Sequence, residues 1–409
     1  MNMEEYFDRN KEKLRQVFER FRNTTYGKKL NLPLNFKDYG EFVKLPLLDP
    51  EKVDLQQLNI PGEGLRQFTT SGVSGHKKTV YRDIGTIVSY PREMDETLRN
   101  NKTLFLHSKR RENESYYETH DFNHKRMYPQ GIFREYGNIE ELLKYVQEGN
   151  VLFIVEYPLM TEWFCYQLEN ALENSKILPK NIRKRKVYLE LSGEPVTRSQ
   201  VENIVERLKK IFQTEVDYVV TYGSNEIGHI GTYTPTIHGS EIIYETIPSV
   251  FVEEINNEII ITPFRTEGTI LLRYKTGDKG AIIFKGDRGP FLKVLGKNPE
   301  EGILYVAGAQ VNIAELASIL RSLLKSPVGL VVNKDEDERA GRCNLNINLH
   351  TVFPIDDSTR NKVSLFIKKF IMDSAVLEIE NHLGITNLEI TYSNEPLKKQ
   401  FIIYKKGGK

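Results

Sequence analysis

The spacing of hydrophobic residues predicts two clear amphipathic helices. In residues 3–23, apolar side chains fall three or four positions apart, at Leu14, Val17, Phe18 and Phe21. The strongest pattern follows Thr197 and Ser199, either of which can cap the start of a helix. One face of that helix would carry Val201, Ile204, Val205, Leu208, Ile211 and Phe212. Both segments are expected to bury one side against a core.

Short apolar runs alternate with helical patterns from residue 139 onward. Helices are predicted over residues 139–149 and near 160–174, and mainly apolar runs cover residues 151–155, 187–191 and 216–220. Strands that are apolar on both sides are typical of parallel sheets with helices on both faces. This alternation predicts an α/β fold with mainly parallel, helix-covered sheets.

After residue 240 the strand candidates follow one another closely. Short turns separate residues 241–246, 257–263, 269–274 and 281–284. Such spacing predicts antiparallel structure, in a small β-subdomain that forms a barrel or a sheet flanking the core.

A domain boundary is predicted at Gly296-Lys297-Asn298-Pro299. Residues 1–297 would then form a large N-terminal domain. Residues 298–409 contain two helical patterns and two strand candidates, so they are expected to form a small α+β domain.

Two segments are expected to lie on the surface. Residues 28–63 are interrupted by four prolines, and residues 108–136 are crowded with charged and aromatic side chains. We interpret the second segment as a solvated excursion, with the rim of a substrate entrance as the alternative. His120 and His124 are four residues apart, but no third ligand is evident, so a metal pair is not predicted.

The composition limits the classes of binding partner and the cellular compartment that can be expected. The 409 residues include 57 Lys and Arg and 56 Asp and Glu, a net charge of +1, so no overall field favours nucleic acid or an anionic membrane. Cys165 and Cys343 are too few for a disulfide framework, which indicates a reducing compartment. Because the acidic start resembles no signal peptide and no apolar run approaches about 18 residues, a cytoplasmic protein is expected.

The stretch from Thr70 to Lys78 combines two glycines, several hydroxyls and two lysines. Glycine permits close backbone approach, and successive backbone N–H groups can form a concave anion site. The stretch is therefore either a phosphate-binding loop or a polar turn before a strand. It is not a Walker A loop, because Lys77 stands where the second glycine of that motif is needed.

Two polar turns follow predicted buried strands, at Ser192-Gly193-Glu194-Pro195 and Tyr222-Gly223-Ser224-Asn225-Glu226. Ligands of open α/β sheets gather beyond the carboxyl ends of strands, so both turns are well placed for binding. Taken alone, Thr276-Gly277-Asp278 would be only a turn between strands.

Together and in this order, these stretches resemble the ATP-handling motifs of the adenylate-forming (ANL) superfamily, which activates carboxylic acids as acyl-AMP. The first motif is matched by Thr70, Ser71, Gly72, Ser74, Gly75 and Lys78. Val73 replaces a usual hydroxyl and Lys77 a usual proline. Gly193, Glu194 and Pro195 match a turn that packs beside the adenine in the family.

The resemblance also implies roles for the later motifs. Tyr222, in the turn with Gly223, Ser224 and Asn225, would flank the adenine, and Glu226 would hold Mg²⁺ and serve catalysis. Asn225 replaces a usual threonine but can still donate to phosphate. Asp278, in a stretch similar to the family's RYRTGD, would accept the ribose hydroxyls.

The hinge and the C-terminal motif are matched less well. Lys297 stands where the family's hinge has arginine, and Gly308 comes two residues later than usual. The family's C-terminal lysine stabilises the adenylation transition state. Lys398 and Lys399 are the candidates for it here, although an exposed basic tail explains them equally.

The best match is the phenylacetate–CoA ligase-like, aryl-acid AMP ligase branch. It implies a large N-terminal domain, a small mobile C-terminal domain, and the use of ATP and Mg²⁺. A small acid, such as a hydroxybenzoate, would be activated with pyrophosphate release and passed to CoA or a carrier-protein phosphopantetheine, in a siderophore- or antibiotic-type pathway. The alternatives are a catalytically degenerate binding protein and, more distantly, a phosphotransferase. The sequence leaves the oligomeric state open.

Overall fold

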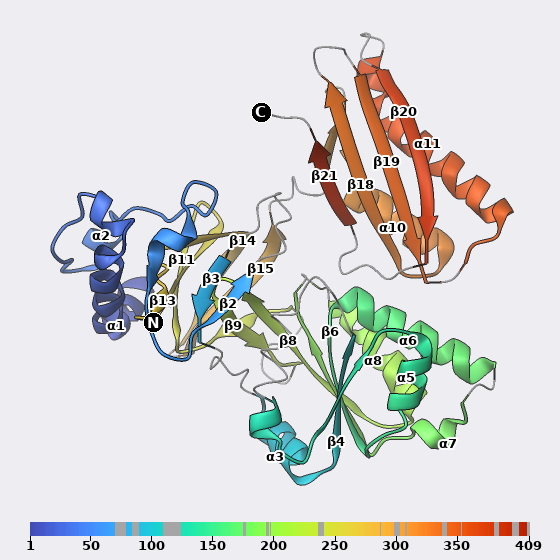
Figure 1. Cartoon of the computed structure of the whole chain (residues 1–409), viewed down its shortest axis with the longest axis horizontal. Coiled ribbons are helices and arrows are strands. Elements are labelled where there is room, and N and C mark those ends of the chain that lie inside the picture. Colours follow the sequence, from blue (N-terminus) through green and yellow to red (C-terminus); the bar gives the residue numbers. More distant parts are fainter. Residues whose placement is uncertain are drawn as a thin grey trace. The chain divides into compact units, whose positions relative to one another are not determined.

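A computed structural model describes most of the chain (Figure 1). The described residues are 1–69, 79–83, 90–108, 124–174, 177–193, 196, 198–235, 241–286, 288–297, 303–306, 309–337, 342–352, 354–379, 384–394 and 401–406. The chain divides into two compact units: Met1–Glu156 with Ile177–Lys297, and Tyr157–Lys176 with Asn298–Lys409. The second unit thus includes residues before the expected boundary, so a division into domains at residue 297 stays a prediction.

The first unit is built on an eleven-stranded sheet in the order β11-β12-β14-β15-β10-β9-β8-β7-β6-β4-β5. Five adjacent strands are parallel: β5 (Ile132–Tyr136), β4 (Thr103–Ser108), β6 (Val151–Glu156), β7 (Lys186–Leu191) and β8 (Val216–Ser224). The others are antiparallel: β9 (Gly228–Tyr233), β10 (Tyr244–Thr246), β15 (Arg288–Lys297), β14 (Tyr274–Lys285), β12 (Glu258–Pro263) and β11 (Val250–Ile255). Both predicted arrangements, the parallel strands and the antiparallel strands, are present. Strand β8 pairs with both and joins them into one sheet, so the antiparallel part does not form a separate barrel.

Two short ribbons complete the strands of this unit. One pairs β1 (Asn59–Ile60) with β13 (Gly268–Thr269). The other is an antiparallel pair of β2 (Arg66–Thr69) and β3 (Thr79–Arg82), in which Thr69 lies opposite Thr79. These two residues flank the predicted phosphate loop, whose residues 70–78 lie outside the described part of the chain.

Helices cover both sides of the parallel strands. Figure 1 shows α3 (Arg92–Asn100) on one side, and α5 (Ile139–Tyr145) and α8 (Arg198–Phe212) on the other. The short α7 (Pro179–Ile182) precedes β7. All the apolar residues predicted to line one face of α8 are buried. Met94 and Leu98 of α3 pack on Phe105, Phe153 and Tyr188 from the sheet.

The N-terminal helix α1 (Met3–Asn23) and the short α2 (Tyr39–Phe42) belong to the same unit. Phe7, Phe36, Phe42 and Phe251 form a cluster of tilted and edge-on rings. Residues 28–63 are mostly exposed, as predicted, but they also contribute buried side chains such as Phe36 and Phe42 to the core. The prolines break the regular structure, but they do not keep the aromatic side chains between them in water.

The fully buried Arg273 explains how this irregular segment is held. Its guanidinium pairs with Glu253 at 3.1 Å and donates to the carbonyl oxygens of Val43 and Leu45. The backbone of Leu48 pairs with Arg273 and Lys275 on either side of Tyr274. Buried charges persist only when paired and hydrogen-bonded, and here one arginine forms an ion pair with a carboxylate and donates to two carbonyls.

The second unit has a four-stranded sheet in the order β20-β19-β18-β21. Its elements are α6 (Pro158–Glu173), β16 (Ile303–Val306), β17 (Ala309–Asn312), α10 (Ile313–Leu324), β18 (Val328–Asp337), β19 (Arg342–Thr351), α11 (Asp357–Ile379), β20 (Gly384–Ser393) and β21 (Phe401–Lys406). Leu316 and Leu320 of α10, Ile347 of β19 and Ile367 of α11 share its core. This α+β arrangement agrees with the expectation for the end of the chain.

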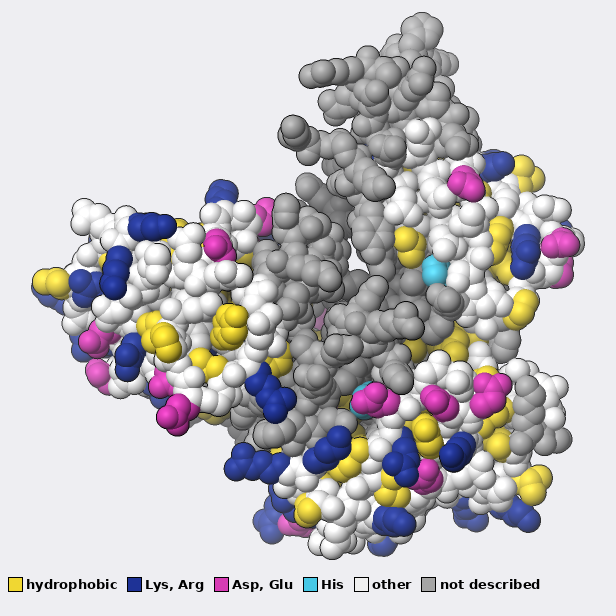
Figure 2. Space-filling model, in the orientation of Figure 1, with side chains coloured by type: hydrophobic (Ala, Val, Ile, Leu, Met, Phe, Trp, Pro, Cys, Tyr) yellow, Lys and Arg dark blue, Asp and Glu magenta, His cyan; other side chains and the backbone are white. Residues whose placement is uncertain are grey.

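On the face drawn in Figure 2, the described basic and acidic side chains are interspersed, in keeping with the net charge of +1. Within the described residues, no helix is both long and apolar enough to span a membrane.

Candidate functional site

Tyr222 at the end of β8 and Asp278 near the start of β14 meet directly. The Tyr222 hydroxyl donates to Oδ2 of Asp278 at 2.6 Å, although β9, β10 and β15 lie between their strands in the sheet. Pairing shifts by one residue at Tyr222/Gly223 and again at Lys279/Gly280. Such bulges bend strands, so the sheet curls where the two predicted motifs lie and brings them together.

The Asp278 carboxylate is held by a bulge in β14. Its own backbone N–H donates to Oγ1 of Thr276 at 3.1 Å, and that hydroxyl donates to the Ile259 carbonyl at 2.8 Å. Gly277 between them has φ of +78°, a conformation that favours glycine. Thr276-Gly277-Asp278 is thus a bulge within β14, not the turn between strands that its sequence alone predicted, and it places the carboxylate beside Tyr222.

Burial and the charge of Asp278 raise the pKa of Tyr222 well above its ordinary value. Tyr222 therefore stays protonated and remains a donor to the carboxylate across the physiological pH range. The ring of Tyr244 on β10 lies 5.7 Å from the Tyr222 ring, and its pKa is raised for the same two reasons. The site has two aromatic rings beside one carboxylate.

Lys297 joins this group by its position in the sheet. It ends β15, and its backbone lies directly opposite Asp278 of β14 in the antiparallel register. Two positions predicted from separate motifs, the ribose acceptor and the hinge residue, are therefore cross-strand partners.

Glu226 lies in the turn between β8 and β9. The backbone N–H of Ile227 donates to Oγ of Ser224 at 3.2 Å, which closes the turn. A Cβ added to Gly223 would come within 2.5 Å of the Gly228 carbonyl oxygen, so this position requires glycine. Burial and the nearby negative charge of Glu226 raise the pKa of the Tyr274 hydroxyl well above its ordinary value.

The structure describes only some of the other predicted site residues. Gly193 follows β7 with φ of +81°, as a tight turn requires. Outside the described residues lie Thr70, Ser71, Gly72, Ser74, Gly75, Lys78, Glu194, Pro195, Lys398 and Lys399. The structure thus brings Tyr222, Asp278 and Lys297 to one place, with Glu226 in the adjoining turn.

Sequence reasoning missed Tyr244, Arg82 and Arg265. Tyr244 stood in a predicted strand without any motif around it. Arg82 and Arg265 donate to the backbone carbonyls of Asn225 and Glu226, respectively. A single sequence contains no signal for such contacts, because the acceptors are backbone atoms distant along the chain.

A second buried polar group lies at the end of β7, on the α3 side of the sheet. Glu190 is fully buried and accepts from the Tyr90 hydroxyl at 2.6 Å and the Thr221 hydroxyl at 3.1 Å. The Tyr90 oxygen also lies 2.8 Å from Nε2 of His124. Burial raises the pKa of Glu190 to about 7, although the hydrogen bonds from Tyr90 and Thr221 lower it.

This finding corrects the interpretation of residues 108–136 as a solvated excursion for part of the described residues only, because Lys125 and Arg126 are exposed as expected. In the described part of that segment, His124, Tyr128 and Tyr136 are all buried. His124 stacks on Phe105 with ring centroids 5.0 Å apart. Because charged residues surround them in the sequence, these aromatic residues were not recognised as part of the core.

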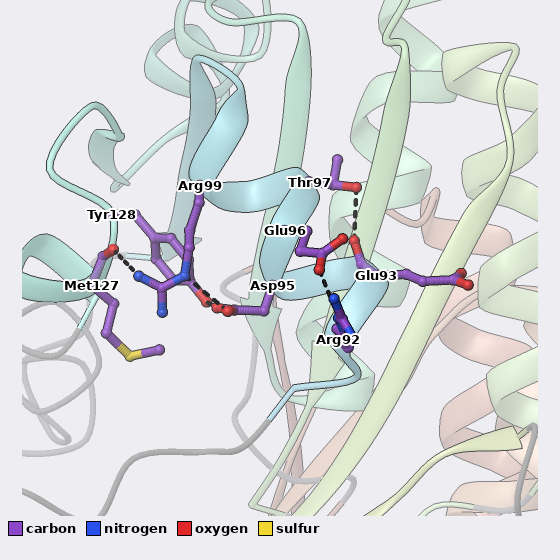
Figure 3. A network of polar contacts seen from close by, with 8 residues as sticks. All are labelled: Arg92, Glu93, Asp95, Glu96, Thr97, Arg99, Met127 and Tyr128. Atoms are coloured by element: carbon purple, nitrogen blue, oxygen red, sulfur yellow. Dashed lines mark hydrogen bonds and ion pairs between the residues drawn. The ribbon is translucent and has the colours of Figure 1, made fainter.

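A polar network attaches α3 to this segment (Figure 3). Asp95 accepts from Arg99 at 2.8 Å and from the Tyr128 hydroxyl at 2.7 Å, and Arg99 also donates to the Met127 carbonyl at 3.1 Å. Burial alone would raise the pKa of Asp95, but the bonds from Arg99 and Tyr128 outweigh burial and lower it. The network thus joins α3 to the segment that contains Met127 and Tyr128.

Among the described residues, no group of three or more His, Cys, Asp or Glu is arranged to hold a metal ion. Glu226 by itself offers one hard oxygen ligand, which suits a Mg²⁺ ion that takes its other ligands from phosphates and water. Asp278 is an acceptor suited to paired hydroxyls.

No protein-family model matches the chain, and no curated protein matches it in sequence. Solved structures do share its fold. A structure of 2-hydroxyisobutyryl-CoA ligase in the postadenylation state, in complex with 2-HIB-AMP, aligns over 98% of this chain and 90% of that one, with a TM-score of 0.55 and 11% identity.

Two further solved structures are less similar to this chain. ATP-bound MatB from Rhodopseudomonas palustris covers 82% of this chain and 65% of its own, with a TM-score of 0.45 and 10% identity. O-succinylbenzoate CoA synthetase (MenE) from Bacillus subtilis in complex with AMP covers 84% and 69%, with a TM-score of 0.43 and 16% identity. The chain has the fold of 2-hydroxyisobutyryl-CoA ligase, and the fold expected from the motif resemblance is confirmed.

Proposed function

We propose that this chain is an adenylate-forming acid–thiol ligase. The observation that carries the proposal is the hydrogen bond between Tyr222 and Asp278, 2.6 Å long, with Lys297 opposite Asp278 in the sheet. Residues from three separate motif-like stretches meet at one place, as they must if they surround one nucleotide. The shared fold with a ligase in complex with an acyl adenylate supports the same reading.

The residues divide the binding of ATP between them. Asp278 would accept hydrogen bonds from the ribose hydroxyls while Tyr222 holds its other oxygen, and Tyr222 and Tyr244 offer rings beside the base. Gly193, Glu194 and Pro195 would complete the adenine side. Thr70, Ser71, Gly72, Ser74, Gly75 and Lys78 would bind phosphate together with Ser224 and Asn225. Glu226 would hold Mg²⁺, which when bound neutralises phosphate charge.

The proposed reaction has two balanced steps. An oxygen of the acid's carboxylate attacks the α-phosphorus of ATP, and the bond to the bridging oxygen breaks to release pyrophosphate. A thiol then loses its proton, its sulfur attacks the acyl carbon, and AMP leaves. The protein contributes mainly orientation and charge stabilisation, with Lys398 or Lys399 as the candidate cation in the first step.

The finer parts of the proposal rest on the motif resemblance. We propose that the substrate is an aryl acid such as a hydroxybenzoate, and that the thiol acceptor is CoA or a carrier-protein phosphopantetheine. The pathway would be a siderophore- or antibiotic-type biosynthesis. The division into domains 1–297 and 298–409 belongs with them. A reducing, cytoplasmic compartment is proposed from the scarcity of cysteine.

Asp278→Asn tests the nucleotide site with least disturbance, because it keeps the size of the side chain. We expect ATP–pyrophosphate exchange, measured with Mg²⁺ against a panel of aryl and short acyl acids, to fall by about 10²–10³. Asp217→Asn is the matched control, since that carboxylate is 61% exposed in a surface ion pair with Lys186.

Equal exchange in wild type and Asp278→Asn would refute the site. ATP-dependent thermal stabilisation without exchange for any acid would instead indicate a binding protein that has lost catalysis. Glu226→Ala is the less clean test, because that carboxylate also lies beside two arginines.

A further inference from the structure

Two arginines hold consecutive carbonyls of the turn between β8 and β9. Nε of Arg82 donates to the Asn225 oxygen at 3.0 Å, and Nη2 of Arg265 donates to the Glu226 oxygen. Arg82 ends β3, and Arg265 lies between β12 and β13. Two segments distant in sequence thus converge on the residues proposed to contact phosphate and Mg²⁺.

Arg82 also binds its own hairpin. Its guanidinium carbon lies 3.8 Å from the centre of the Phe68 ring on β2, and its Nη1 donates to the Asp83 oxygen at 3.2 Å. Only 5% of Arg82 is exposed. Since β2 and β3 are the strands on either side of residues 70–78, one side chain connects both arms of that hairpin to the β8–β9 turn.

The charges around the turn are balanced. Burial lowers the pKa of Arg265 to about 9, and the nearby positive charge of Arg82 lowers it further, while Asp83 and Glu226 oppose the shift. Burial likewise lowers the pKa of Arg82 to about 10 against Asp83 and Glu226. Two like charges share this region because the carboxylates of Glu226 and Asp83 compensate them.

We propose that Arg82 and Arg265 are positioning residues that fix the β8–β9 turn, and that Arg82 couples this turn to the β2–β3 hairpin. The purpose of the coupling rests on the proposed function: residues 70–78 and Glu226 would meet the phosphates of one nucleotide in a set geometry. The coupling itself is a property of the protein without ligand, and it is testable in that state.

Hydrogen–deuterium exchange of the ligand-free protein tests the coupling. In Arg82→Met, which keeps an apolar stem against Phe68, we expect backbone amides at 224–228 to exchange at least ~10-fold faster than in wild type. Arg66→Met is the matched control, because Arg66 lies directly opposite Arg82 in the same hairpin and is exposed. Unchanged protection of the turn in folded Arg82→Met would overturn the proposal.

Conservative variants keep the test decisive if Arg82→Met does not fold. Arg82→Lys and Arg265→Lys retain the charge but lose the planar fork of donors. We expect each to loosen the turn less than Arg82→Met, with Arg82→Lys also changing exchange at 79–82 and Arg265→Lys acting on the turn alone. Wild-type exchange in both lysine variants would also overturn the proposal.

Calorimetry then tests the consequence for nucleotide binding. Losing a hydrogen bond from a charged donor should weaken MgATP binding by about 10- to 100-fold in Arg82→Met. AMP lacks the outer phosphates and depends on Tyr222 and Asp278, so its affinity should change by no more than about threefold. Equal losses of affinity for MgATP and AMP would indicate general damage to the binding site and would overturn the positioning role. A wild type that binds neither nucleotide would refute the proposed function, whereas hydrogen exchange would still decide the coupling.

Discussion

Replacing the buried Glu190 by glutamine should stabilise the protein at alkaline pH. Glu190 is fully buried and accepts hydrogen bonds from Tyr90 and Thr221. Among the described residues, Tyr90, His124 and Tyr128 are titratable groups that face it. Glutamine resembles the protonated carboxyl group, because its oxygen can accept from Thr221 while its amide donates to the Tyr90 oxygen.

The magnitude follows from the raised pKa. Burial moves the pKa of Glu190 from 4.5 to about 7, which corresponds to about 3 kcal/mol. In the folded protein the carboxyl keeps its proton up to about pH 7, whereas the unfolded chain releases it near pH 4.5. The stabilising contribution of the protonated group is therefore complete below pH 4.5, decreases as pH rises, and is lost above pH 7.

Urea unfolding followed by far-UV circular dichroism, at pH 4.5 and pH 8.5, measures the effect. We expect Glu190→Gln to differ little from wild type at the lower pH and to gain up to about 3 kcal/mol at the higher one. Glu19→Gln is the control, since it removes a carboxylate from an exposed position of α1. A stability difference that stays constant between the two pH values would refute the reasoning.

Two further predictions concern the buried contacts of the first unit. Arg273→Met should destabilise the protein by about 3–5 kcal/mol in urea unfolding, because it strands the buried Glu253 carboxylate. Adding Glu253→Leu should recover part of the loss, and no recovery would contradict the ion-pair explanation. Tyr222→Phe should leave the fold intact and weaken MgATP binding by about tenfold or more in calorimetry, since Asp278 loses its donor. Unchanged affinity would argue against a role for this hydrogen bond in the site.

Much of the first unit followed from local patterns. The alternation of apolar runs and helical spacing indicated the parallel strands β6, β7 and β8, and the burial of one face of α8 agrees with it. These elements were predictable because each buries side chains that the sequence places at a regular interval. Where polar and aromatic residues mix, as around His124 and Tyr128, no such interval exists, and the burial was missed.

The candidate site was predictable as a set of residues but not as a geometry. Asp278 stood in a short stretch that looked like a simple turn, and only the curl of the antiparallel strands brings it to Tyr222. Arg82 and Arg265 gave no signal at all, because they recognise backbone oxygens of the Asn225–Glu226 turn.

The sequence by itself determined several of the strands and helices, among them β6, β7, β8 and α8, and which polar stretches follow strand ends. Those properties depend on neighbours within a few residues, through periodicity, glycine and capping. The tertiary structure alone decided that β8 joins two kinds of sheet, that Arg273 is buried as a structural ion pair, and that burial raises the pKa of Glu190 to about 7. These depend on long-range contacts and desolvation, which arise only when distant parts of the chain pack together.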